Sequence, residues 1–223
     1  MSDIFREVDD DIRRDQMKKL WDRFGPFVIG AAVLIVLATA GFRGWEYWQT
    51  RQAENAGDRF IAAIEAANAG EHEQAVAALE DLASDGSGAY PVLARFRLAT
   101  EKASAGDNAG AIGEYDAVAD DRSVSSEIRS IARLRAAFIL VDTSTAAELM
   151  ERIGDLAETG NPWRHTAREL LGMASWRNGD FEAARGYFEQ VSVDQETPND
   201  LRQRSQVMLG LINARIGQPA DSG

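Results

Sequence analysis

One recurring spacing restricts the fold more than any other feature: a glycine, a small residue five positions later and a large apolar residue nine positions later. It occurs as Gly70–Ala75–Leu79, as Gly106–Ala111–Tyr115 and as Gly179–Ala184–Phe188. The first two glycines are 36 residues apart and the last two are 73 apart. A degenerate copy is therefore expected near residues 124–158, where 145–157 has helical apolar spacing but no glycine turn. Intervals of this size are typical of solenoids built from helix pairs.

Helix packing explains the spacing. Glycine tolerates the left-handed backbone of a hairpin turn, and a small side chain lets two helix axes approach to about 8–10 Å. The large residue one turn later fills the space against the neighbouring helix. A single hairpin cannot bury its apolar face alone, so stacked hairpins share a core. With only five prolines in 223 residues, the predicted fold class is all-α.

An uncharged apolar segment, residues 24–42, precedes the repeats and is bounded by Arg23 and Arg43. As a helix it would extend about 28 Å, close to the roughly 30 Å of a hydrocarbon core. Aromatic residues typical of membrane interfaces flank it, namely Trp21, Trp45, Tyr47 and Trp48. Six Lys/Arg precede the segment and three follow within twenty residues. The positive-inside rule therefore predicts a cytoplasmic N-terminus and a C-terminal part across the membrane.

A cleaved signal peptide is the main alternative for this segment, because Ala38-Thr39-Ala40 fits the small-x-small cleavage pattern. The apolar run continues to Phe42, however, and a long charged segment precedes it, which favours an uncleaved anchor. A buried core helix would leave the charged flanks unexplained. The predicted parts are a cytoplasmic amphipathic segment (1–23), a transmembrane helix in contact with lipid (24–45) and a periplasmic repeat domain (46–223) of about four helix pairs plus a terminal helix.

The first 23 residues and the start of the span place apolar side chains on one face of a helix. These are Phe5, Val8, Ile12, Leu20, Trp21 and Phe24. Two interpretations are open: a helix resting on the lipid surface, or a docking helix for a cytosolic partner. The basic residues favour the lipid surface, since anionic headgroups attract them.

Composition removes several classes of function. Cysteine is absent, and the two histidines, His72 and His165, lie in different repeats, so we expect no metal site and no catalytic set. The glycines of residues 105–113 lack the Lys-Ser/Thr of a phosphate loop. A net charge of −12 disfavours nucleic acid. We expect no enzyme, no cofactor and no small-molecule substrate.

The best-formed repeat, with Leu171-Gly172, Gly179-Asp180-Phe181, Ala184 and Phe188, resembles the tetratricopeptide repeat. Leu209-Gly210 repeats its start 38 residues later, which suggests a terminal capping helix, whereas Ala62-Ala63 and Leu98-Ala99 depart from the pattern. In that family the first helix of each pair lines a concave peptide-binding groove. The resemblance implies these groove residues: Phe60, Ile64, Phe96, Thr100, Met173, Trp176 and Arg177. For Phe60, Phe96 and Trp176, packing in the core is the competing interpretation.

The order of parts resembles the ancillary subunits of the bacterial SecYEG translocon (the YfgM type): the approach at 13–25, one span, a first helix from Ala53 to Ala69 and weak repeats. This resemblance implies a single-pass inner-membrane protein whose periplasmic domain works beside the translocon with chaperones or folding factors and receives newly translocated proteins. The acidic surface would suit basic, unfolded clients. The alternatives are a scaffold of outer-membrane assembly or cell-wall synthesis, a soluble periplasmic binding module released after Ala40, and an enzyme with an unrecognised carboxylate site.

Overall fold

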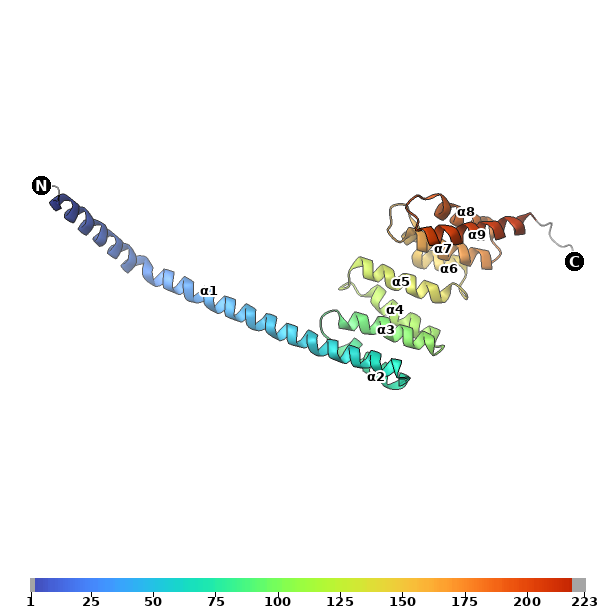
Figure 1. The fold of residues 1–223 in the computed structure, drawn as a ribbon, viewed down its shortest axis with the longest axis horizontal. Helices are drawn as coiled ribbons and strands as arrows, with labels where there is room; N and C mark the ends of the chain where they lie inside the picture. The colour runs from blue at the N-terminus through green and yellow to red at the C-terminus, as the bar shows by residue number, and fades with distance from the viewer. Residues whose placement is uncertain (1–2, 218–223) are drawn as a thin grey trace. The chain divides into compact units, whose positions relative to one another are not determined.

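The computed structural model describes residues 3–217, which contain helices and connecting turns and no strand (Figure 1). The elements are α1 (Asp3–Asn68), α2 (His72–Asp85), α3 (Tyr90–Ser104), α4 (Asn108–Asp120), α5 (Ser126–Leu140), α6 (Ala146–Ile153), the 3₁₀ turn η1 (Gly154–Ala157), α7 (Arg164–Arg177), α8 (Phe181–Val193) and α9 (Asn199–Ile216). The prediction of an all-α fold is confirmed. The side chains of 3–17, 19, 20, 22 and 28 lie outside the described residues, and with them Phe5, Val8, Ile12 and Leu20 of the predicted amphipathic face.

The chain divides into two compact units, Met1–Asn55 and Ala56–Gly223. In the first unit, α1 includes a stretch long and apolar enough to cross a membrane, and 6% of it is buried. Large side chains such as Phe27 and Leu34 are 76% and 67% exposed. A core helix would be mostly buried, so this exposure argues against the core-helix interpretation and leaves a candidate membrane span. The predicted boundary at residue 45 does not coincide with a helix end, because α1 runs to Asn68; it stays a prediction.

The second unit is a stack of antiparallel helix pairs. The end of α1 pairs with α2, and the pairs α3/α4, α5/α6 and α7/α8 follow (Figure 1). From α2 to α9 each helix packs mainly on the helices before and after it in the chain. The last helix, α9, packs on α8 and, over a smaller area, on α7. The degenerate copy expected near 124–158 is present as the α5/α6 pair.

Three of the hairpin turns share one backbone geometry. Gly70, Gly106 and Gly179 have φ of 84°, 84° and 81°, as predicted for left-handed turn glycines. In each turn the N–H of the following residue donates to the carbonyl five residues earlier, at 2.8–2.9 Å. This is the Schellman closure of a helix C-terminus.

The α5/α6 turn uses different chemistry, because it has no glycine. The N–H groups of Thr143 and Ser144 donate to the Leu140 carbonyl at 2.9 and 2.8 Å. Thr145 and Glu148 then form a reciprocal capping box that starts α6. The helix is only eight residues long and ends in η1. The third pair is therefore shorter than the others.

The hydrophobic core consists of four clusters along the stack. The small residues of the repeat, Ala75, Ala111 and Ala184, are fully buried, and the large ones are at most 5% exposed. Helices in the middle contribute to two clusters at once: on α3, Leu98 packs towards α1 and α2 whereas Ala99 packs towards α4 and α5. The packing explanation of the spacing is confirmed.

Candidate partner-binding cleft

The seven predicted groove residues lie on three helices: Phe60 and Ile64 on α1, Phe96 and Thr100 on α3, and Met173, Trp176 and Arg177 on α7. Three of them are half-buried aromatic residues that pack on a neighbouring ring. The ring centroids are 6.0 Å apart for Phe60–Tyr90, 5.6 Å for Phe96–Tyr115 and 4.9 Å for Trp176–Phe181. Each also packs against a core cluster. Helix packing thus accounts for these three side chains, and partner binding through them stays a prediction.

The other four predicted residues are partly or fully accessible. Ile64 is half-buried, and the exposed Thr100 hydroxyl donates back to the Phe96 carbonyl at 3.0 Å. The exposed Arg177 guanidinium donates to the Ser144 carbonyl and, at 3.1 Å, to Asn178 Oδ1. Among the seven, Met173 lines a cleft. The structure therefore does not gather all seven residues into one site.

The cleft that contains Met173 has a volume of about 400 Å³ and is formed by α7, α8 and α9. Its apolar lining is Met173, Phe188, Val207 and Met208, and its polar lining is Glu169, Gln203 and Arg204. We call it the α7–α9 cleft. Methionine is flexible and polarizable, so it adapts to apolar partners of different shape. A mainly apolar concave surface with a few polar groups is the usual form of a binding site.

A close approach of α7 and α8 forms one wall of this cleft. A Cβ atom added to Gly172 would lie 2.9 Å from Cε2 of Phe188, whose ring is 1% exposed. Glycine at this position therefore lets the Phe188 ring press against the α7 backbone. At the rim, Arg204 makes two hydrogen bonds to the buried Glu169 carboxylate, at 2.8 and 3.2 Å, and this pairing raises the pKa of Arg204.

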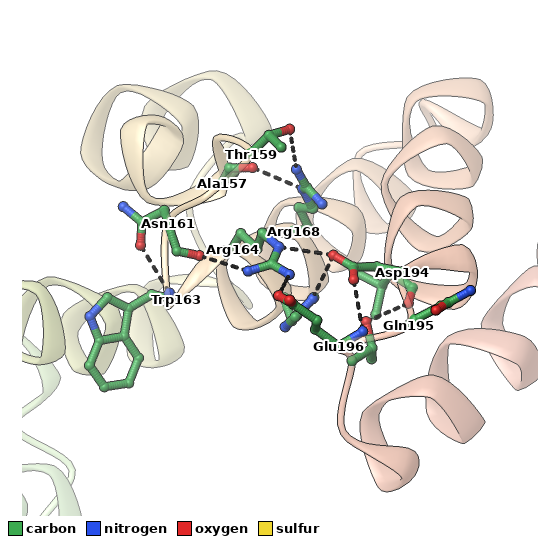
Figure 2. A network of polar contacts seen from close by, with 12 residues as sticks. Ala157, Thr159, Asn161, Trp163, Arg164, Arg168, Asp194, Gln195 and Glu196 are labelled. Atoms are coloured by element: carbon green, nitrogen blue, oxygen red, sulfur yellow. Dashed lines mark hydrogen bonds and ion pairs between the residues drawn. The ribbon is translucent and has the colours of Figure 1, made fainter.

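A polar network fixes the start of α7 to the loop before α9 (Figure 2). Arg164 Nε donates to Asp194 Oδ2 at 2.9 Å, and its Nη2 pairs with Glu196. His165 Nε2 also lies 2.9 Å from Asp194 Oδ2. The Arg164 guanidinium, the Glu196 backbone N–H and His165 hold the pKa of the Asp194 carboxyl far below its usual range. Arg202 on α9 donates to the Asp194 carbonyl at 3.1 Å, so the same loop is bonded to both α7 and α9.

The described residues offer no metal site, since no group of three or more His, Asp or Glu side chains converges there. His72 on α2 lies 3.3 Å from Glu101 on α3, and His165 on α7 contacts Asp194 at the end of α8, so the two histidines pair with carboxylates at separate places in the stack.

Most of the α7–α9 cleft was missed at the level of sequence: Glu169, Phe188, Gln203, Arg204, Val207 and Met208 are not among the predicted partner residues. The repeat register contained a usable signal. The 38-residue step from Leu171-Gly172 to Leu209-Gly210 carries Met173 onto Leu211 and Arg177 onto Arg215. Applying that step would have placed candidate residues on α9 next to the cleft.

A stack of helix pairs with left-handed glycine turns and an adaptable apolar cleft defines a helical-repeat protein of the class that binds other proteins. Comparison with known families is consistent with this class. Residues 18–212 match the tetratricopeptide repeat-like domain family, and the chain belongs to that family. It is similar to the ancillary SecYEG translocon subunit of Escherichia coli strain K12, with 24% identity over 170 residues, covering 75% of this chain and 81% of the relative. No solved structure matches the chain.

Proposed function

We propose that this chain is a non-enzymatic, membrane-anchored accessory of the Sec translocon that binds translocon subunits, periplasmic folding factors and newly translocated proteins through its repeats. One observation carries the proposal. The family match spans residues 18–212, so it includes the apolar helix together with the repeats. A relative of which this chain covers 81% is an ancillary SecYEG translocon subunit.

The proposed topology has the N-terminus in the cytoplasm and the repeats in the periplasm. Contacts at the end of the apolar segment support a membrane interface there: the Trp45 and Trp48 rings are 5.4 Å apart, and Arg51 Nε donates to the Tyr47 hydroxyl at 3.0 Å. Such amphipathic aromatic groups favour the headgroup region.

The topology can be tested with single cysteines, because the chain contains none. Ser2→Cys and Ser222→Cys variants would be treated with a membrane-impermeant maleimide on spheroplasts. We expect labelling of the Ser222→Cys variant on intact spheroplasts and labelling of the Ser2→Cys variant only after lysis. The reverse pattern would contradict the topology, and a shortened chain beginning after Ala40 would support the cleaved signal peptide.

The proposed clients are unfolded and basic. A second cleft, of about 530 Å³ between α4, α5 and α6, supports this chemistry because its lining includes four carboxylates, Asp116, Asp120, Glu148 and Glu151, against two arginines, Arg133 and Arg152. Complementary charge accelerates encounter more than it strengthens binding. This is the behaviour expected of a protein that holds clients briefly.

The deciding experiment is purification of the tagged full chain from native membranes in a mild detergent, with mass spectrometry of the bound proteins. A chain lacking residues 52–223 is the control. Enrichment of translocon subunits or periplasmic folding factors that disappears in the control supports the proposal. Enrichment of outer-membrane assembly or cell-wall synthesis proteins instead would contradict it and favour the alternative scaffold.

A further inference from the structure

Helices α7 and α9 each have a glycine at the same place in the repeat, and a large side chain packs on the glycine of α7 but not on that of α9. Gly172 receives the ring of Phe188, which lies where a Cβ atom at position 172 would clash at 2.9 Å. Gly210 stands 38 residues later in the same register. A Cβ atom added there would meet nothing within 4 Å. In the described part of the chain, α9 therefore has the glycine that admits a large side chain but lacks the side chain.

The residues around Gly210 form an exposed apolar face on α9. Val207 and Leu211 are 61% and 52% exposed, and Ala214 is exposed as well. Residues three and four positions apart lie on one side of a helix, so Val207, Gly210, Leu211 and Ala214 share that side. We call this the α9 face. It adjoins the α7–α9 cleft through Val207, which lines both surfaces.

The charge around the α9 face differs from that of the whole protein. Helix α9 contains three arginines and one carboxylate, whereas the chain has a net charge of −12. Arg215 follows Leu211 by one turn, and its guanidinium carbon lies 5.9 Å from the Phe181 ring centroid. Arg215 is exposed, and no described carboxylate lies within ion-pair distance of its guanidinium. The apolar face therefore has one exposed cation beside it on α9.

We propose that the α9 face binds an amphipathic helix of a partner protein, in the way that α8 packs on α7, with a large apolar side chain over Gly210 and carboxylates beside Arg215. This inference rests on the proposed protein-binding function and specifies its partner. A helix fits this surface because the α7/α8 hairpin shows that a large side chain from a neighbouring helix can pack on a glycine in this position. Carboxylates on that helix would pair with the exposed Arg215 guanidinium. Helix-in-groove recognition anchored at i, i+3 or i+4 and i+7 follows the same rules.

A second copy of this chain fits the surface less well. A two-fold dimer through the α9 face would place the same surface on both sides. It would bring the Arg215 side chains of both protomers into one interface without a carboxylate from α9 to pair with them, because Asp200 already pairs with Arg204. Like charges in such an interface oppose association.

The test uses the full chain in lipid nanodiscs and three synthetic fluorescent peptides of about five helical turns. The first has Leu and Phe on one face and Glu on both flanks. The second replaces every Glu with Lys, and the third places prolines mid-sequence to prevent a helix. Binding is measured by fluorescence anisotropy. Gly210→Leu fills the open position, and the matched control is Gly113→Leu, since Gly113 is an exposed helical glycine on α4 that also has nothing within 4 Å of its added Cβ.

We expect the Glu peptide to bind and Gly210→Leu to weaken it by about tenfold or more, the loss typical of a blocked central contact. Gly113→Leu should leave binding unchanged, and Arg215→Glu should remove the preference for Glu over Lys. Circular dichroism would check that each variant is folded. The proposal is overturned if the Glu peptide does not bind, if the Lys or proline peptide binds equally well, or if Gly210→Leu instead abolishes self-association seen by mass photometry.

The two proposals fail separately. If the Gly210→Leu variant still co-purifies with translocon subunits and no peptide binds, the proposed accessory role is supported and the helix-binding site on α9 is refuted. If the Glu peptide binds but the full chain co-purifies with another envelope complex, the helix-binding site on α9 is supported and the proposed role at the translocon is refuted.

Discussion

Alanine at two glycines in equivalent register positions should change stability in opposite directions. In Gly172→Ala the new Cβ would lie 2.9 Å from Cε2 of the Phe188 ring, which is 1% exposed, so the ring or the helix backbone must shift. Overpacking of this type costs about 1–3 kcal/mol, and the better helix propensity of alanine returns about 0.5–1 kcal/mol, so we expect a net loss of about 1–2 kcal/mol. In Gly210→Ala the Cβ meets nothing within 4 Å, so only the propensity gain of about 0.5–1 kcal/mol remains.

The two variants would be compared by thermal and urea unfolding of the full chain in detergent, followed by far-UV circular dichroism. For a domain of this size about 1 kcal/mol corresponds to a shift of about 2–4 °C in Tm. The Tm of Gly172→Ala should be lower than that of the parent, and the Tm of Gly210→Ala slightly higher. The slope of the unfolding free energy against urea concentration should be the same in all three proteins. The packing argument is refuted if Gly172→Ala is as stable as the parent, or if both variants shift the same way.

Three further changes test other contacts. Phe188→Ala should lower the free energy of unfolding by about 3–5 kcal/mol, and Phe181→Ala, whose ring is half-buried, by clearly less in the same urea assay. Thr145→Ala removes the capping box of α6 and should lower the free energy of unfolding by about 1 kcal/mol, whereas Thr100→Ala should leave it nearly unchanged. Asp194 has a lowered pKa, so its ion pair stabilises the fold above the unfolded-state pKa of about 3.9 and loses that effect as pH falls further. Asp194→Asn should therefore be less stable than the parent at pH 7, with a gap that narrows at pH 3; a gap independent of pH would contradict this account.

The sequence was sufficient for features that depend on local backbone chemistry. A turn that needs φ near 80° selects glycine, so Gly70, Gly106 and Gly179 marked three hairpins directly. The period located the third pair as well. The repeat period did not predict that α6 would end after eight residues in a 3₁₀ turn, although Gly154 stands at that end of the helix.

The candidate site was harder to predict, because a large apolar residue on a helix looks the same whether it packs in the core or faces a groove. Phe96 and Met173 both lie on the first helix of a pair, yet Phe96 packs on Tyr115 and Met173 lines a cleft. What separates them is the neighbouring helix, which a single sequence does not show. Val207 and Leu211 were not among the predicted residues, because the sequence does not show that α9 leaves them 61% and 52% exposed.

The division of the core into four clusters limits how far the effect of a bound partner can extend. The last cluster joins Ala184, Phe188 and Ile212, and the one nearest the N-terminal end of the stack joins α1, α2 and α3. In an array whose elements contact only their neighbours, free energy gained at one end passes to the other through every intermediate contact. Occupancy of α9 should therefore leave the packing of α1, α2 and α3 almost unchanged, which means a coupling free energy near zero between the two ends of the stack. A partner bound on α9 would alter the helices that it touches and leave the opposite end of the array as it was.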